Sequence, residues 1–226
     1  MDILFRASST GHIMTAPKLK SETLSEGCKT HLVDLFVRTK YGRKTDINTR
    51  YTIKGNMVEE DSLTLYSRYK KQFYKKNELV FQNEFISGTP DIVLTDEIID
   101  IKSSWDIYTF FRSKQKVNKL YYWQLQSYMA LTNTKKATLA YCLINTPDIL
   151  INDEKRRLMY KMGVIDTSKD FETACNEIDL AMTYDDIPIN EKIIEIEILR
   201  NDEDIERLYQ KVIECRQYMK TYLFND

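Results

Sequence analysis

The sequence is poor in the residues that build metal clusters, disulfide frameworks and flexible linkers. Its 226 residues include only four cysteines, two histidines, six glycines and four prolines. No two cysteines form a C-x-x-C pair, and no short Cys/His spacing is typical of zinc or of an iron–sulfur cluster. We therefore expect reduced cysteines packed as small apolar side chains, and no long flexible linker.

Further absences narrow the possible functions. His12 and His31 lie far in sequence from the acidic segment described below, which disfavours nucleases that use histidine as a base or as several metal ligands. No glycine-rich phosphate loop occurs, so no built-in ATP-driven motor is expected. The net charge is only −1, so any nucleic-acid site must be a local patch. No apolar run of about 18 residues occurs, and the start MDILFRASST does not fit a signal peptide, so we expect a cytoplasmic protein without a membrane span.

The composition that remains is ordinary for one globular domain over residues 1–226, with 42% hydrophobic and 30% charged residues. Apolar residues at helical spacing predict helices over about 22–41, 57–74, 118–132 and 202–223. Short segments rich in Ile, Val and Phe predict strands over 78–87, 91–94, 97–102, 135–145 and 192–199, the first three forming one meander. This order predicts an α/β fold with a central mixed sheet flanked by helices.

Some segments have a more specific expectation. The predicted helix 57–74 has its apolar stripe on Val58, Ser62, Leu65, Tyr66, Tyr69 and Phe73. Residues 41–55 are polar and predict a mobile connection, whereas 146–186 give only weak signals for helices and loops. We expect a core over about 55–145, an N-terminal helical segment over 1–54, and a C-terminal strand and helix over 187–226.

The segment SGTPDIVLTDEIIDIKSS, residues 87–104, carries charge inside a strand pattern. Side chains alternate faces along a strand, so Asp100 and Lys102 share one face and Ile99 and Ile101 share the other. The turn TDE folds this strand back on DIVL, which begins with Asp91. The two strands can therefore bring Asp91 beside Asp100 and Lys102 at one end of a sheet.

Two carboxylates against an apolar face are costly unless a cation compensates them. Mg²⁺ does this with one or two carboxylates, together with water and phosphate. A neighbouring lysine adds positive charge for a phosphate or for an attacking hydroxide. The alternative is a surface hairpin whose Asp and Lys form a cross-strand ion pair, which would contribute little.

The segment TPDIVLTDEIIDIKSS resembles the core of the PD-(D/E)xK nuclease superfamily. In YYWQLQSYMAL, Gln124-x-x-x-Tyr128 resembles the Q-x-x-x-Y signature of RecB-like and lambda-exonuclease (YqaJ-like) nucleases. The upstream family motif is matched by Gly55, Glu59, Ser62 and Tyr66, with serine where the family usually has alanine. The resemblance covers about residues 4–145 and implies a restriction-endonuclease-like core.

The resemblance implies a role for each matched residue. Asp91, Asp100 and the backbone carbonyl of Ile101 would bind the metal, and Lys102 would position or deprotonate the attacking water, with a pKa lowered by the ion. Glu59 would assist the metal. Two alternatives to this role stay open: a capping-box contact with Asn56, or replacement by Glu60. Gln124 and Tyr128, at i and i+4 on one helix face, would meet the active site; the alternative is a core-facing helix.

DNA contacts are expected at two further places. Arg6 and Ser8 are candidates for a DNA phosphate, including a terminal 5′-phosphate, and a helix cap by Ser8 or Ser9 is the competing interpretation. Two basic runs could follow a DNA backbone or be solvated faces: Arg112, Lys114, Lys116 and Lys119, and then Lys70, Lys71, Lys75 and Lys76. Three aromatic residues, Trp105, Tyr108 and Phe110, could stack on a base or pack in the core.

The charge pattern and the resemblance together lead us to expect a Mg²⁺-dependent DNA nuclease, and the resemblance implies an exonuclease with two ions and with Mn²⁺ as a substitute. The resemblance implies a phage-type enzyme that degrades one strand of double-stranded DNA 5′→3′ from free ends, in recombination or DNA processing. It also implies ring-shaped homo-oligomers and a single-strand annealing protein as partner, in the host cytoplasm if the protein is phage-encoded. The rivals are a structure- or site-specific endonuclease on the same core and an inactive DNA-binding module.

Overall fold

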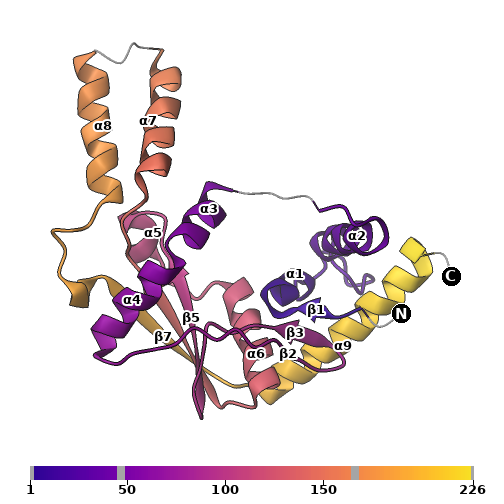
Figure 1. The fold of residues 1–226 in the computed structure, drawn as a ribbon. Helices are drawn as coiled ribbons and strands as arrows, with labels where there is room; N and C mark the ends of the chain where they lie inside the picture. The colour runs from indigo at the N-terminus through magenta and orange to yellow at the C-terminus, as the bar shows by residue number, and fades with distance from the viewer. Residues whose placement is uncertain (1–2, 45–48, 164–167, 225–226) are drawn as a thin grey trace.

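Two mixed sheets and the helices around them make up the fold, which the computed structural model describes for residues 3–44, 49–163 and 168–224 (Figure 1). The strands are β1 (Phe5–Arg6), β2 (Phe81–Gln82), β3 (Ile86–Gly88), β4 (Ile92–Val93), β5 (Glu97–Ser103), β6 (Lys136–Cys142) and β7 (Ile193–Leu199). The helices are η1 (Ala7–Ser9), α1 (Thr10–Ile13), α2 (Glu26–Tyr41), α3 (Arg50–Met57), α4 (Glu59–Lys70), α5 (Ile107–Arg112), α6 (Lys119–Thr132), α7 (Asp148–Met162), α8 (Lys169–Met182), η2 (Ile189–Glu191), α9 (Asp202–Met219) and η3 (Lys220–Phe224).

The larger sheet has the strand order β4-β5-β6-β7. β5 and β6 are parallel and joined through α5 and α6, whereas β4 and β7 are antiparallel to their neighbours. In β7 the predicted alternation holds: Ile194 and Ile198 are buried, and Glu195 and Glu197 between them are not. The predicted α/β class with a mixed sheet flanked by helices is confirmed.

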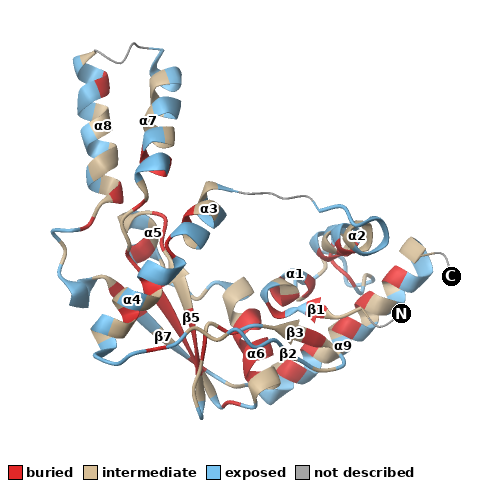
Figure 2. Ribbon diagram, viewed as in Figure 1, coloured by how far each residue is buried: buried red, intermediate tan, exposed pale blue. Residues whose placement is uncertain are grey.

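Both faces of this sheet are covered, so its inner strands are buried on two sides (Figure 2). On one face Ile98 and Leu139 pack with Leu125 of α6. On the other face Ile99 and Ala140 pack with Tyr66 of α4. Since β5 lies between β4 and β6, any polar side chain on it needs a partner within the protein.

The segment 78–87 differs from its prediction. It forms not one strand of the larger meander but the hairpin of β2 and β3, in a second sheet of order β1-β3-β2. The side-chain oxygen of Asn83 accepts hydrogen bonds from the N–H groups of Phe85 and Ile86, each 2.9 Å long. The Asn83 side chain thereby stabilises a turn that reverses the chain, where the apolar pattern predicted one uninterrupted strand.

The region before β2 also differs from its prediction. The predicted connection 41–55 contains α3, whose first turn is capped by Thr49, and residues 45–48 of it lie outside the described residues. The predicted helix 57–74 is shorter, because α4 ends at Lys70 and Lys71 adopts a left-handed conformation with φ 53°. Phe73 therefore lies beyond the helix and is 86% exposed instead of extending the apolar stripe.

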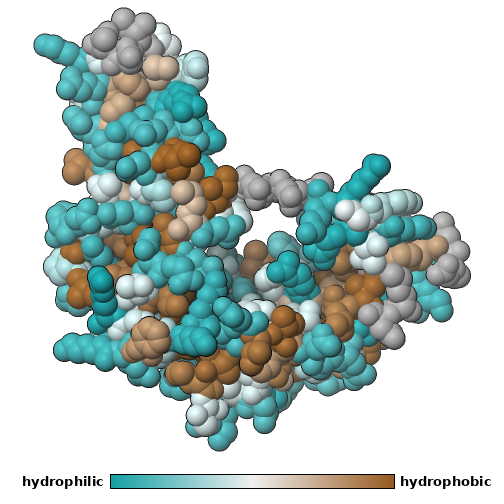
Figure 3. All heavy atoms as spheres, viewed as in Figure 1, coloured by the Kyte–Doolittle hydropathy of each residue, from teal (hydrophilic) through white to brown (hydrophobic). Residues whose placement is uncertain are grey.

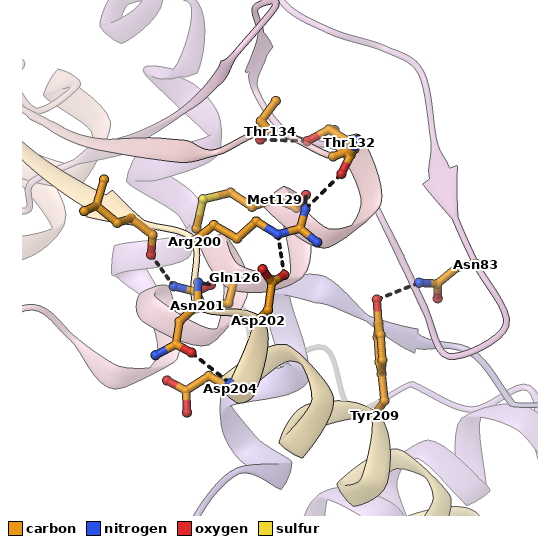
Figure 4. A network of polar contacts seen from close by, with 12 residues as sticks. Asn83, Gln126, Met129, Thr132, Thr134, Arg200, Asn201, Asp202, Asp204 and Tyr209 are labelled. Carbon is orange, nitrogen blue, oxygen red and sulfur yellow. Dashed lines mark hydrogen bonds and ion pairs between the residues drawn. The ribbon is translucent and has the colours of Figure 1, made fainter.

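The predicted helix 118–132 is present as α6, and side-chain amides hold it in place (Figure 4). Gln126 is buried; its amide donates to the Leu199 carbonyl over 2.8 Å and accepts from the Asn201 N–H over 2.9 Å. The Arg200 guanidinium donates to the Met129 carbonyl over 3.0 Å. These contacts fix α6 against the junction of β7 and α9, and thereby fix the side chains on its opposite face.

The weakly patterned region 146–186 forms the helices α7 and α8, which extend from the body as an arm with mostly exposed side chains (Figures 1 and 2). A Lys155–Asp179 ion pair of 2.6 Å joins the two helices. Within the described residues, no helix is long and apolar enough to cross a membrane.

Candidate active site

The pairing of β4 with β5 brings the two predicted carboxylates together. Ile92 lies opposite Ile99, so Asp91, directly before β4, lies next to Asp100 across the strand pair. Asp91 Oδ2 accepts a 2.7 Å hydrogen bond from the Ile101 N–H, because β4 begins only at Ile92 and has no residue opposite Ile101. The side chains of Asp91, Asp100 and Lys102 thus meet at one end of β4.

Asp100 is the most constrained of these groups, with 1% of its surface exposed. Its Oδ1 accepts a 3.2 Å hydrogen bond from Gln124 Nε2, and its Oδ2 lies 2.7 Å from Lys102 Nζ. The ammonium does not lie in hydrogen-bond geometry toward Oδ2, so this oxygen is paired by charge but has no hydrogen-bond donor among the described residues. One lysine thus faces the two carboxylates of Asp91 and Asp100, and a further cation is one way to compensate the second negative charge.

The α6 face that carries Gln124 and Tyr128 closes this site from above the sheet. Gln124 Nε2 donates both to Asp100 and, over 3.1 Å, to the Tyr128 hydroxyl. Gly88 of β3 makes room for Tyr128, because a Cβ there would lie 2.6 Å from the tyrosine ring. The structure therefore brings this helix face to Asp100, as its predicted place at the active site requires. Gln124 and Tyr128 are also both buried.

The two acids and the lysine shift each other's protonation. Burial, then repulsion from Asp100, raises the pKa of Asp91 to about 7. Burial acts to lower the pKa of Lys102, but attraction to Asp100 and then to Asp91 outweighs it and raises that pKa above its usual value. The lysine pKa was expected to fall beside a metal ion; with the carboxylates alone the shift is upward.

The donor set fits a hard divalent cation. Mg²⁺ takes oxygen ligands and usually only one or two protein carboxylates, and here Asp91 and Asp100 offer two, one of them with the buried oxygen that lacks a donor. Within the described residues no group of three His, Cys, Asp or Glu side chains is close enough to hold a metal. The structure thus supports a two-carboxylate site, with Glu59 outside it in this conformation.

Glu59 begins α4 beside the site, but its carboxylate is half exposed and lies 2.6 Å from Lys76 Nζ. The capping-box alternative is weakened, because the residue before the helix is Val58 rather than Asn56 and no side chain caps the first turn. The other alternative, Glu60, also lies near Lys76, at 4.0 Å from its Nζ. One turn later, the Ser62 hydroxyl lies 2.7 Å from the Ser103 hydroxyl and joins α4 to β5.

The N-terminal candidates are held near Asp91 by the smaller sheet. Arg6 pairs with Ser87, four residues before Asp91, and the Thr10 hydroxyl lies 3.1 Å from that of Ser127 on α6. Arg6 and Ser8 are both exposed. The competing cap by Ser9 is not formed, because its hydroxyl donates to the Arg6 carbonyl instead.

The basic run after β5 is exposed as predicted, comprising Arg112, Lys114, Lys116 and Lys119. Of the three aromatic candidates, Phe110 packs in the core and Trp105 is buried against α7, whereas Tyr108 is 62% exposed. Of these three, Tyr108 alone can therefore present its ring to a base.

The surface is hollowed between α3 on one side and α1 and α2 on the other (Figure 3).

Lys54 is a residue that the sequence did not single out. Its side chain is 1% exposed, and its Nζ donates to the carbonyls of Ser104 and Trp105, each over 2.7 Å. Burial lowers its pKa to about 7, with a small opposing effect from Asp106. Lys54 thus fixes the chain two residues after Lys102, and no spacing pattern in the polar segment 41–55 marks it.

The fold of the chain matches that of solved exonucleases. A phage-related exonuclease from Haemophilus somnus 129PT is 24% identical, with a TM-score of 0.78 over 100% of this chain and 97% of the other. An alkaline exonuclease from Laribacter hongkongensis is 14% identical, with a TM-score of 0.64 over 96% and 88% of the two chains. The same exonuclease in complex with dAMP gives 15% identity and a TM-score of 0.62 over 96% and 92%.

The chain has the exonuclease fold. The likeness spans nearly the whole length of each protein, including 146–226, where the sequence resemblance was only general. It confirms the predicted resemblance at the level of fold. No known family matches the chain by its sequence profile. No curated protein is similar to it in sequence.

Proposed function

We propose that this protein is a Mg²⁺-dependent deoxyribonuclease that degrades double-stranded DNA from its ends, 5′→3′. The observation that carries the proposal is the buried Asp100, which is held by Gln124 and Lys102 and lies next to a second carboxylate, Asp91. A purely structural ion pair between Asp100 and Lys102 would not need the second carboxylate of Asp91 beside it. The exonuclease fold supports the same reaction class.

Each side chain has a definite task in this proposal. Asp91, Asp100 and the Ile101 carbonyl would hold one or two Mg²⁺ ions, or Mn²⁺ in their place, with Glu59 joining after it leaves Lys76. Bound Mg²⁺ supplies Lewis acidity for the phosphate and acidifies a water molecule. Lys102 stabilises the negative charge that grows on the phosphate, from a position fixed by Asp100. Gln124 keeps the Asp100 carboxylate in one orientation.

In this proposal the exposed Arg6 and Ser8 contact the terminal phosphate and the exposed basic run 112–119 contacts the DNA backbone. The hollow in Figure 3 is a candidate path for the DNA. Each phosphate contact releases counterions, so DNA affinity should fall steeply with salt. The neighbour solved with dAMP carries a nucleotide, in keeping with such a path. The proposal extends to ring-shaped homo-oligomers, to a single-strand annealing protein as partner, and to the host cytoplasm as the place of action.

The decisive experiment is the digestion of an end-labelled duplex with Mg²⁺, comparing 5′-phosphate and 5′-hydroxyl ends. We expect loss of the 5′ label first, faster digestion of the phosphorylated end, and no cleavage by Lys102→Ala, which should still bind DNA. A covalently closed circle serves as the control for the endonuclease alternative. Cleavage of that circle, or equal cleavage by Lys102→Ala, would contradict the proposal.

A further inference from the structure

A second surface hollow lies beside the active site, between α4 and residues 71–78. We call it the α4 groove; it encloses about 610 Å³ and is lined by Arg68, Phe73, Lys75 and their neighbours. Its lining contains none of the candidate active-site residues Asp91, Asp100 and Lys102. Its volume lies in the range of pockets that bind small molecules or short polymer segments.

Phe73 is the unusual side chain of the α4 groove. It is 86% exposed, although its neighbour Tyr74 is buried, because Lys71 turns the chain out of the helix before Phe73 can reach the core. A single exposed apolar residue is common and needs no explanation. An exposed aromatic ring that lines a hollow among cations is a more specific arrangement, since such rings are where unpaired bases stack.

The charges of the α4 groove favour an anionic occupant. Arg68, Lys71 and Lys75 form no ion pair within the described part of the chain. Lys76 is partly neutralised by Glu59, and the acidic members of the lining are Glu60 and Glu78. The lining therefore keeps a net positive charge, which suits a phosphate backbone better than the apolar surface of a protein.

One end of the α4 groove lies close to Asp91, since Asn77 stands between the lining residues Lys76 and Glu78 and contacts the backbone at Asp91. The Asn77 N–H donates to the Asp91 carbonyl over 2.7 Å, and its side-chain amide donates to the Pro90 carbonyl over 3.0 Å. Three residues lie between Phe73 and Asn77, so their Cα atoms are at most about 14 Å apart. At most about four stacked nucleotides, at roughly 3.4 Å each, would span that distance.

We propose that the α4 groove binds single-stranded nucleic acid, with one unpaired base stacked on Phe73 and phosphates against Arg68, Lys71 and Lys75. A base inside a duplex cannot offer its face to the ring, so a single strand is favoured over a duplex. The inference rests on the proposed nuclease function, because it assigns the groove to the strand that cleavage leaves unpaired next to Asp91. In this proposal the unpaired strand leaves the active site along the α4 groove.

Binding can be tested without cleavage, by fluorescence anisotropy in EDTA with labelled dT₂₀ and a blunt 20-base-pair duplex as probes. Phe73→Ala should weaken dT₂₀ binding by about 5- to 100-fold, as loss of one stacking ring does. Phe73→Trp should retain binding, and the duplex should lose much less. Tyr160→Ala on α7 is the matched control, since Tyr160 is 75% exposed but lies outside the groove.

The charged part of the groove has its own test. The double variant Arg68→Gln, Lys75→Gln should reduce the salt dependence of dT₂₀ binding by about two phosphate contacts, whereas Lys161→Gln on α7 should not. Unchanged dT₂₀ binding by Phe73→Ala would overturn the inference, as would an equal loss on the duplex. A changed oligomeric mass with unchanged dT₂₀ binding would show instead that Phe73 contacts protein.

The two proposals can fail separately. If the wild-type protein cleaves no duplex but binds dT₂₀ through Phe73, the nuclease function fails, and the groove loses its assigned role while keeping its ligand. If the protein digests duplex ends and Phe73→Ala neither weakens dT₂₀ binding nor slows digestion, the nuclease function stands and the groove proposal is wrong.

Discussion

The two sides of the candidate site differ in how firmly their charged groups are held. On the β5 side, Asp100 is buried, contacts Gln124 and Lys102, and lies under a helix that is fixed by its own amide contacts. On the α4 side, Glu59 is half exposed and, among the residues that the structure describes, pairs with Lys76 alone. Nearby, the α4 groove presents Phe73 to solvent.

The difference has a simple physical origin. A buried charge must have fixed partners, because removing one leaves the other desolvated and unpaired, at a cost of several kcal/mol. An exposed pair contributes about 0–1 kcal/mol, so it can open when a better partner arrives. We infer that the β5 side sets the chemistry, and that the α4 side can rearrange around metal and DNA.

The largest effect is expected for Asp100→Asn on the buried side. The substitution keeps the shape but removes the charge for the metal, and several kcal/mol of transition-state stabilisation correspond to a rate loss of roughly 10³-fold or more. In the wild type, Mg²⁺ should also raise the melting temperature by binding to the folded state, and this shift should vanish in the variant. Asp96→Asn, in the exposed β4–β5 turn, is the control. A retained Mg²⁺ shift would show that Asp100 is not a ligand.

A smaller effect is expected for Gln124→Leu. It removes the donor to Asp100 Oδ1, and loss of a contact that orients a metal ligand typically costs about 10- to 100-fold in metal affinity or activity. Tyr128→Phe should cost less, because Gln124 keeps its bond to Asp100 when the hydroxyl is absent. Steady-state digestion rates across a Mg²⁺ titration would measure both. Equal losses in the two variants would mean that Tyr128 acts directly.

The next effect concerns stability rather than rate. Lys54→Met leaves the Ser104 carbonyl buried without its donor and the Trp105 carbonyl with only a 3.4 Å hydrogen bond from the Thr146 hydroxyl, which should lower the free energy of unfolding by about 1–3 kcal/mol. Urea denaturation of both proteins measures the difference. An uncharged amine still has two N–H groups, so Lys54 can keep both hydrogen bonds when it loses its proton.

The same variant predicts a pH dependence with a definite sign. The folded-state pKa of Lys54, about 7, lies below its usual value of 10.5. Between these values the unfolded chain binds the extra proton, so the stability that Lys54 contributes rises with pH and is lost as pH falls toward 7. The other groups around its ammonium are Asp106, Tyr184 and, over Trp105, Arg50. A wild-type advantage over Lys54→Met that is no larger at pH 9.5 than at pH 7 would contradict this.

The smallest effect is expected on the exposed side, for Lys76→Ala. Its ion pair with Glu59 is half exposed, so the free energy of unfolding should fall by less than about 1 kcal/mol, and less still at high salt. Urea denaturation at two salt concentrations would check this. A loss as large as that of Lys54→Met would erase the proposed difference between the two sides.

The parts of the site that the sequence predicted belong to single elements or to adjacent ones. Alternation along β5 placed Asp100 and Lys102 on one face, a tight turn placed Asp91 opposite them, and i, i+4 spacing put Gln124 and Tyr128 together. The carboxylate pair and its lysine were thus predictable, because short-range geometry alone brings them close. Their catalytic and metal-binding roles stay predictions.

The parts that the sequence missed depend on contacts between distant segments. Nothing local marks Lys54, whose partners lie 50 and 51 residues further along the chain. Phe73 fitted a helical stripe and became exposed because Lys71 ends the helix, and residues 78–87 fitted a strand but were turned by Asn83. In each case a turn or a buried carbonyl outweighed the local apolar pattern.

The sequence by itself determined which residues share a face, because the repeat of a strand or helix follows from backbone geometry. The tertiary structure alone decided what each face meets. It buried Asp100 under α6 without a donor for one oxygen, opened Glu59 toward Lys76, and left Phe73 in a basic hollow. Desolvation and unsatisfied hydrogen bonds arise only once distant segments pack together, and these give the candidate site its chemistry.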